Sequence, residues 1–296
     1  MTIERSVATG IGADHEDWLA AWNHIRAQGV LANNYDYIQV GKIIQAAGVW
    51  GDLLTPAGYR VRFICPFEDS HKGNPIAGYT TIIPPGSHSI QPDFDVTGGA
   101  NTSGIIEING LRIILNHGGL GFYLSNSSWK YDQKHILKNT LIDGNSIAGT
   151  FGVQSNRETS WLEMSNMKIY DCIVRGYGNN GGTTGGVGPW PTSMVSVIEN
   201  VTIFNCGGIG IEAENKWDRY TVFRNVVSCG NTVDWKLIAG ATTGATEYQW
   251  TYNCADSDGS IANGNNKQQN IIAANEFISL DKTSPNFLRL KTGIVI

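Results

Sequence analysis

The sequence is poor in charge: Asp, Glu, Lys and Arg make up only 16% of its 296 residues, against about a quarter in typical soluble domains. Coiled coils, helical bundles and charged disordered chains need far more Glu and Lys, so the composition excludes them. Runs of Lys and Arg are missing and the net charge is −5, which argues against a nucleic-acid-binding surface. No apolar stretch approaches the roughly 20 residues of a membrane-spanning helix, so no membrane partner is expected.

The sequence also lacks the usual signs of export and of metal binding. Its first residues contain no basic segment followed by an apolar one, the pattern of a secretory signal peptide. The five cysteines are widely spaced and form no CxxC pair, which disfavours a zinc or redox site. The segment from Asp256 to Ser260 begins like a calcium loop, but Lys267 stands where a bidentate Glu is needed. We therefore expect buried free thiols in a chain folded in a reducing cytoplasm, with no metal and no cofactor.

What the sequence has in abundance is Gly, with 36 residues, and Asn. From residue 105 one sequence pattern recurs: alternating apolar and polar residues, an Asn, a second short alternating stretch and a Gly. Successive marker asparagines are separated by 25 residues (200 to 225) to 34 residues (166 to 200). Such self-similarity is typical of stacked repeats. The markers are Asn109, Asn139, Asn166, Asn200, Asn225 and Asn253.

Within each copy the apolar residues alternate, which predicts strands. In the copy around Asn200, Val201 and Ile203 point inward, and Ile209 and Ile211 form the next inward set after a Gly turn. Asn tolerates the left-handed conformation at a tight bend, and its amide can bond to the same Asn one repeat away. We therefore expect a ladder of stacked asparagines along the repeats.

Residues 1–34 differ from the repeats and predict an N-terminal cap with one amphipathic helix over 14–29. Asp14 is the expected N-cap, and Gly29 ends the helix. Trp18, Leu19, Trp22 and Ile25 share one face of this helix. A stack of parallel strands needs its open end covered, so we interpret the helix as a plug. Residues 35–296 form the repeat domain in this division, with its first strands over Ile38–Ile44 and Arg60–Ile64 and irregular segments over 67–101 and 178–193.

These features together resemble the right-handed parallel β-helix, or pectate-lyase-like, superfamily. The resemblance is carried by ENVTIFNCGGIGIEAEN (residues 199–215), by the other Asn-led copies, and by a terminal phrase over 275–280 and 286–293. It implies an all-β fold: a single-stranded right-handed parallel β-helix with a short N-terminal capping α-helix.

Over its whole length the sequence most resembles β-helix proteins of bacteriophages and environmental viral sequences. That resemblance implies a non-enzymatic virion structural protein, such as a head decoration or cement protein, a fibre or a spike component. Its expected location is the virion, after synthesis in the host cytoplasm. The expected partners are other capsid or tail proteins and further copies of the chain, in a homo-oligomer for which a trimer is one option.

An enzymatic alternative stays open. The Asp pair, Gly-His-Gly and Arg-Ile-Lys of polygalacturonases are missing, and the nearest match is Asn116-His117-Gly118-Gly119. Glu212 and Glu214 are nevertheless expected to face outward from one strand, about 7 Å apart, at the low end of the range for inverting glycoside hydrolysis. With Asp234 on the neighbouring repeat they predict the site of a polysaccharide depolymerase, either a glycoside hydrolase or a lyase.

Two further interpretations use the same groove. A carbohydrate-binding module without turnover would need only aromatic residues such as Tyr123 and Trp217. The plainest alternative is a solvated outer face that binds no glycan at all.

Attachment to partners is expected at the irregular segments. Trp190, in the Gly-rich insert 178–193, and Trp129 could bury large apolar area at low ordering cost. Pro84 and Pro85 interrupt regular strand pairing in the segment 67–101, as suits a docking loop. These four residues are the predicted interface candidates.

Overall fold

The structure is a computed structural model of the chain. It describes all residues except 11, 30, 49, 51–57, 88–89, 91–103, 118–119, 126–132, 148–150, 157–159, 173–186, 190–194, 215–219, 239–249, 252–253, 256–270 and 293–296.

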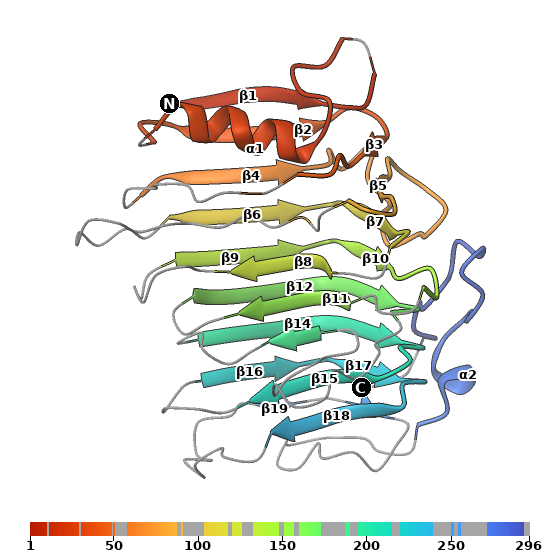
Figure 1. Cartoon of the computed structure of the whole chain (residues 1–296). Helices are drawn as coiled ribbons and strands as arrows, with labels where there is room; N and C mark the ends of the chain where they lie inside the picture. Colours follow the sequence, from red (N-terminus) through yellow and green to blue (C-terminus); the bar gives the residue numbers. More distant parts are fainter. Residues whose placement is uncertain are drawn as a thin grey trace.

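The strands lie in three parallel rows, and each pass of the chain adds one strand to a row (Figure 1). Row 1 holds β1 (Thr2–Val7), β2 (Asn34–Gln39), β4 (Arg60–Ile64), β6 (Ile105–Asn109), β9 (Gln133–Lys138), the first parts of β12 (Ser160–Tyr170) and β14 (Val195–Phe204), β16 (Tyr220–Arg224) and β19 (Trp250–Thr251). Row 2 holds β3 (Ile43–Ile44), β5 (Thr81–Ile83), β7 (Arg112–Leu115), β10 (Leu141–Asp143), the ends of β12 and β14, β17 (Val227–Cys229) and β20 (Cys254–Ala255). Row 3 holds β8 (Leu120–Ser125), β11 (Phe151–Asn156), β13 (Val187–Pro189), β15 (Ile209–Glu214) and β18 (Val233–Ile238).

All pairings between these named strands are parallel. Rows 1 and 2 join into one sheet of 15 described strands because β12 and β14 run through both rows, and row 3 forms a second sheet of five described strands. The all-β class predicted from the sequence is therefore confirmed.

The core fills the space between the rows. In β4, Val61 and Phe63 are fully buried while Arg62 between them points outward, which is the period of two predicted for strands. The same alternation in neighbouring strands stacks the apolar side chains in register into one cluster. Members of this cluster include Ile108, Ile113, Phe122, Ile142, Val153, Met164, Ile169, Ile198, Ile203, Ile211 and Trp235.

The asparagine turns lie where the repeats predicted them. Asn139, Asn166, Asn200 and Asn225 all have the left-handed conformation, with φ between 50° and 54°. Asn109 departs from the pattern: it ends β6, and Gly110 takes the left-handed position, with φ 79°. Asn253 lies outside the described residues.

The predicted amphipathic helix is present as α1 (Trp18–Ala27), but Asp14 is not its cap. The N-cap is Asp17, whose carboxylate accepts from the backbone N–H of Ala20 at 2.7 Å and from that of Ala46 at 2.6 Å. Asp14 instead accepts from the backbone N–H of Ser6 at 2.7 Å. Sequence spacing favoured Asp14, but tertiary contacts hold it beside β1.

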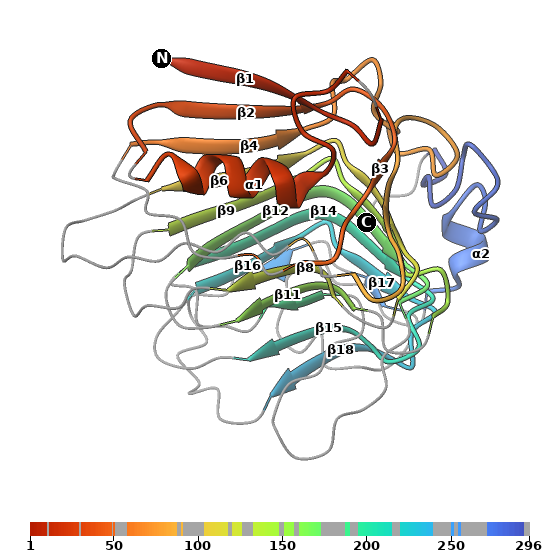
Figure 2. The same ribbon diagram turned by 45° about the horizontal axis from the view of Figure 1, so that its top comes forward.

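Helix α1 covers the side of the first passes. Figure 2 shows it on the same side of row 1 as the row 3 strands. Its Trp18 ring contacts the Phe63 ring at a centroid distance of 5.2 Å, and Trp18 Nε1 donates to Thr81 Oγ1 at 3.1 Å. Because row 3 begins only at β8, the helix closes the core where no row 3 strand is described.

Strand β1 precedes the helix and was not predicted. It pairs with β2 along its whole length, so residues 2–7 extend row 1 within the segment that the sequence assigned to a cap. The boundary near residue 34 stays a prediction.

The two irregular segments contain strands. β5 lies inside 67–101, and β13 lies inside 178–193, where it pairs with β11 and β15. Short strands of three residues fall below the length at which alternation can be recognised in a sequence.

Residues 271–292, here named the C-terminal strap, include the short helix α2 (Ala273–Glu276) and lie on the outer face of row 2 (Figure 1). Phe277, Phe287 and Leu288 of the strap are nearly fully buried there. They form a second apolar cluster with outward residues of row 2, among them Leu141 and Tyr170. Residues 271–292 thus pack on the chain itself.

Candidate functional site

The predicted acidic pair lies on one strand. Glu212 and Glu214 are two residues apart in β15. β18 pairs with β15 in a register that places Lys236 opposite Glu212. The side chains of these three residues lie outside the described part of the structure.

Asp234, the third predicted acid, is not on an open face. Its side chain is completely buried, and its Oδ1 accepts from Asn231 Nδ2 at 2.9 Å. The hydroxyl of Ser228 donates to the Asp234 backbone oxygen at 2.8 Å, and Asn231 Nδ2 also donates to that hydroxyl at 3.0 Å. The turn between β17 and β18 therefore folds onto Asp234, so the Asp234 carboxylate is not exposed to a substrate on an open face.

Two of the four predicted interface residues are described. Pro84 is half-buried and Pro85 is exposed, in a turn closed by the Ser87 backbone N–H, which donates to the Pro84 oxygen at 3.1 Å. Trp129 and Trp190 lie outside the described residues, although Trp190 directly follows β13. The calcium-like segment 256–260 and Trp217 also lie outside them, as does the side chain of Tyr123.

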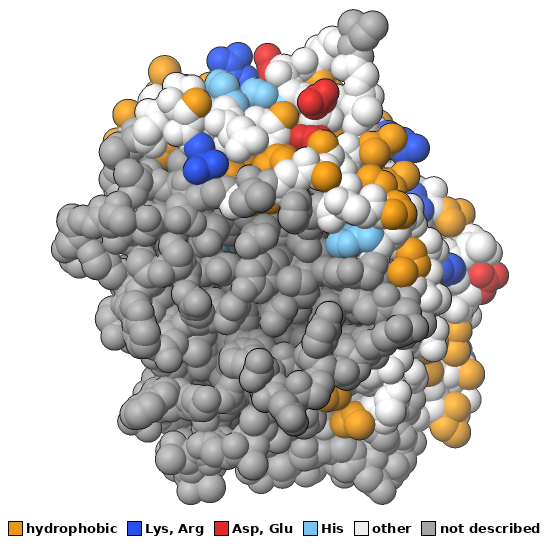
Figure 3. All heavy atoms as spheres, viewed as in Figure 1, with side chains coloured by type: hydrophobic (Ala, Val, Ile, Leu, Met, Phe, Trp, Pro, Cys, Tyr) orange, Lys and Arg blue, Asp and Glu red, His pale blue; other side chains and the backbone are white. Residues whose placement is uncertain are grey.

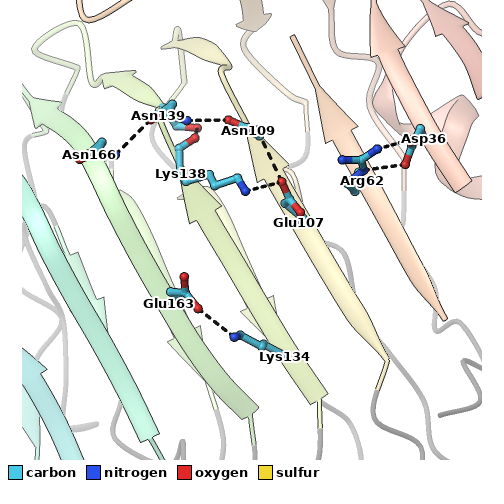
Figure 4. A network of polar contacts seen from close by, with 10 residues as sticks. Asp36, Arg62, Glu107, Asn109, Lys134, Lys138, Asn139, Glu163 and Asn166 are labelled. Atoms are coloured by element: carbon cyan, nitrogen blue, oxygen red, sulfur yellow. Dashed lines mark hydrogen bonds and ion pairs between the residues drawn. The ribbon is translucent and has the colours of Figure 1, made fainter. Parts of the chain in front are cut away.

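The outer face of row 1 carries a network of polar contacts (Figure 4). Arg62 donates to Asp36 through two nitrogens, with Nε at 2.7 Å from Oδ1. Similar ion pairs join other neighbouring strands: Lys138 to Glu107 at 2.8 Å, Lys134 to Glu163 at 2.9 Å, and Arg224 to Glu199 at 2.7 Å. These carboxylates each have a cation as partner, so they act in the stacking of strands.

The asparagine ladder runs beside these ion pairs (Figure 4). Asn139 Nδ2 donates to Asn109 Oδ1 at 2.9 Å, and Asn166 Nδ2 donates to Asn139 Oδ1 at 3.3 Å. Further along row 1, Asn225 Nδ2 donates to Asn200 Oδ1 at 3.0 Å. The predicted ladder is confirmed for these pairs.

Lys168 joins the segment 67–80 to the C-terminal strap on the outer face of row 2. Its Nζ donates to the backbone oxygen of Gly73 at 2.9 Å and to that of Phe287 in the strap at 2.5 Å. Burial, with the nearby charge of Arg289, lowers the pKa of Lys168 to about 8. The segment 67–80 is thus fixed to the body of the protein, where the sequence predicted a docking loop.

His71, in the same segment, is buried against the asparagine turns. Its Nε2 lies 2.7 Å from the Asn139 backbone oxygen, and its Nδ1 accepts from the Gly73 N–H at 2.8 Å. These contacts assign the proton to Nε2, and burial lowers the pKa of His71 to about 4. No local sequence pattern indicates a role for this histidine, because its partner is a backbone group 68 residues away.

A second attachment of the strap is electrostatic. Lys282 Nζ lies 2.9 Å from Asp171 Oδ2 and 3.6 Å from Asp143 Oδ1. Burial opposes the charged ammonium, but these contacts outweigh it, so the pKa of Lys282 is raised. Burial also raises the pKa of Asp143, and Asn205 Nδ2 donates to Asp171 Oδ1 at 2.6 Å.

A pair of histidines lies at the N-terminal end of row 1. The rings of His15 and His24 are 4.7 Å apart, and His24 Nδ1 lies 3.1 Å from the Tyr37 hydroxyl. Burial lowers the pKa of both histidines, and the charge of Arg5 adds to the effect. His15 also binds the outer edge of β1, because its backbone N–H donates to the Ser6 oxygen at 3.1 Å.

Four cysteines are described: Cys65, Cys172, Cys206 and Cys229 are buried thiols, as predicted. Among the described residues, no group of three or more His, Cys, Asp or Glu side chains is placed to hold a metal ion. In the same part of the chain, no helix has the length and apolar character needed to cross a membrane.

Comparison with known proteins gave no match to a family model, a curated protein or a solved structure.

Proposed function

We propose that the chain is a single-stranded right-handed parallel β-helix. The support is the order of its strands, since most passes visit row 1, row 2 and row 3 in turn, and each strand pairs in parallel with the same row of the next pass. A path of this kind is a solenoid, which buries its core only by stacking passes on one another. An experimental structure in which the passes wind left-handed would refute the proposal.

We further propose that the protein is a virion structural component, such as a head decoration or cement protein, a fibre or a spike, without enzymatic activity. The observation that carries this is the row 1 face, where charged and amide side chains bind the next pass. A surface so arranged makes a rigid rod. The Asn-led copies resemble bacteriophage β-helix proteins. From this resemblance we infer the location in the virion and the capsid or tail proteins as partners.

Purified particles of the virus that encodes the chain test this proposal. Quantitative mass spectrometry of washed, density-banded particles should find the chain in a fixed ratio to the major capsid protein. The chain present in the lysate but absent from banded particles would contradict a virion role.

A polysaccharide depolymerase is the second candidate, because Glu212 and Glu214 are two residues apart in β15 and the strand register places Lys236 opposite Glu212. Glu212→Gln should then abolish the release of reducing ends from host capsular or cell-wall polysaccharide. Glu199→Gln is the matched control, since Glu199 is ion-paired to Arg224 on row 1. Saturable glycan binding without cleavage would favour the binding module instead.

A further inference from the structure

Three isoleucines form a ladder on the outer face of row 2. Ile44, Ile82 and Ile114 are consecutive partners in the register of β3, β5 and β7. Ile44 is 43% exposed, and the other two are half-buried. Because strands in a sheet are about 4.8 Å apart, the ladder is a flat row of equally spaced, identical side chains.

The strap covers the continuation of this ladder but not the ladder itself. The next positions in the same register are Asp143, Tyr170 and Phe204. Tyr170 is 1% exposed because Phe287 packs against it, at a ring-centroid distance of 4.7 Å. The outer face of row 2 is thus a surface that apolar side chains of this chain already cover over part of its length.

Exposed apolar side chains of the adjoining segments extend the ladder into a patch. Phe67 and Ile76 of the segment 67–80 are 76% and 55% exposed, and Ile278 and Leu290 of the strap are 47% and 37% exposed. The contacts of Lys168 hold these two segments together on the same side of the molecule. Figure 3 shows hydrophobic side chains along this flank, at the right of the view. We name it the apolar flank: Ile44, Phe67, Ile76, Ile82, Ile114, Ile278 and Leu290.

We propose that the apolar flank is where two copies of this chain pack face to face around a two-fold axis near Ile82. Such an axis places Ile44 opposite the partner's Ile114 and Ile82 opposite the partner's Ile82. Isoleucine then packs on isoleucine along the whole ladder, which contains no charged residue. A two-fold interface needs this self-complementarity, and three equally spaced isoleucines provide it. The inference rests on the proposed structural role only in its expectation of a homo-oligomer.

The exposed area reaches the lower limit of a specific interface. The most exposed members of the flank each leave on the order of 100 Å² accessible, so two copies would bury roughly 1,000 to 1,200 Å² in total, the lower limit for a specific interface. A patch of this size matches the largest apolar patch of a typical single chain, which is often functional.

Sedimentation velocity of the full chain tests the proposal. At tens of micromolar the protein should have twice its chain mass of 32.1 kDa, and Ile82→Lys should shift the dissociation constant upward at least 100-fold. Ile136→Lys is the matched control and should leave the dimer intact, because Ile136 is a half-buried isoleucine of β9 on the row 1 side. A monomeric wild type, or a dimer that survives Ile82→Lys, would overturn the inference.

A cysteine variant tests the position of the two-fold axis without placing a charge in the interface. Ile82→Cys should give a disulfide-linked dimer on mild oxidation, whereas Ile136→Cys and the wild type should stay uncrosslinked. Equal crosslinking of the two variants would overturn the placement. A monomer that is nevertheless found in banded particles refutes only this inference, and a dimer absent from particles refutes only the virion role.

Discussion

Single asparagines determine how tightly successive passes join. Asn139 combines the left-handed conformation with two side-chain hydrogen bonds, one to Asn109 and one from Asn166. Asn139→Ala should lower the free energy of unfolding by about 3 kcal/mol, since the strained backbone costs about 1–2 kcal/mol and each lost hydrogen bond about 1. Asn139→Gly should lose only the hydrogen-bond part, about 1–2 kcal/mol. Urea unfolding measures both, and equal losses would contradict the conformational contribution.

His135 should make the protein sensitive to acid. It stands in the core between Ile106 and Leu162 in the row 1 register, and burial lowers its pKa to about 4 from 6.5. The unfolded chain binds the proton more readily, so the contribution to stability is complete above pH 6.5 and is lost as the pH falls to 4. Its upper limit is about 3 kcal/mol.

His135→Leu should therefore flatten the dependence of unfolding free energy on pH between 6.5 and 4, because Leu matches the apolar neighbours. Part of the slope should persist through His71, whose pKa is also lowered to about 4. Urea unfolding at several pH values gives the slopes. An unchanged slope in His135→Leu would show that this histidine is not the group that titrates.

At the scale of elements, mutation can separate the two candidate N-caps of α1: Asp14, expected from the sequence, and Asp17, observed in the structure. Asp17→Ala should cost about 2 kcal/mol, because it removes the N-cap acceptor and leaves the backbone N–H of Ala46 without its carboxylate partner. Asp14→Ala should cost less than about 1 kcal/mol, since Asp14 is exposed and binds only the edge of β1. Thermal unfolding of the two variants compares them, and the reverse order would restore the sequence-based assignment.

The strap should open as a unit when its apolar anchor is removed. Phe287 packs against Tyr170 and Phe204, and Cys229 is fully buried in the same cluster. Phe287→Ala should cost about 3 kcal/mol and speed the reaction of Cys229 with a thiol reagent, while Cys172 and Cys206 in the main core stay slow. Peptide mapping of the labelled protein would show which thiols react, and uniform labelling of all three would contradict local opening.

The sequence predicted the elements that repeat and missed those that do not. The strands around Asn166 and Asn200 and the turns themselves follow from the period of two and from the conformational preference of Asn. β1, β13 and the packing of the strap depend on contacts between distant residues, such as Lys168 with Phe287, and no local pattern encodes these. The same holds for Asp234, whose burial comes from a turn that the alternation does not reveal.

At the scale of the whole molecule, the rows imply that stability is distributed unevenly along the stack. A central strand such as β12 pairs with β9 and β14, whereas among the described strands β1 pairs with β2 alone and has a single bridge, Val7 to His15, at its other edge. Stability in stacked repeats is approximately a sum of nearest-neighbour terms, so the end of row 1 should open before its centre. The Ser6 and His15 contacts restrain only the last part of β1.

Native-state hydrogen exchange in low urea should resolve this gradient. Amides of β1 should exchange through a local opening with little dependence on urea, and amides of β12 only through global unfolding. Met164→Ala, which removes a fully buried side chain of β12, should cost about 3 kcal/mol and speed the exchange of both strands. Val7→Ala at the end of β1 should speed exchange mainly in β1 and β2, because β1 pairs with no other described strand. If β1 and β12 exchanged with the same free energy and the same urea dependence, the stack would unfold as one cooperative unit and the nearest-neighbour description would fail.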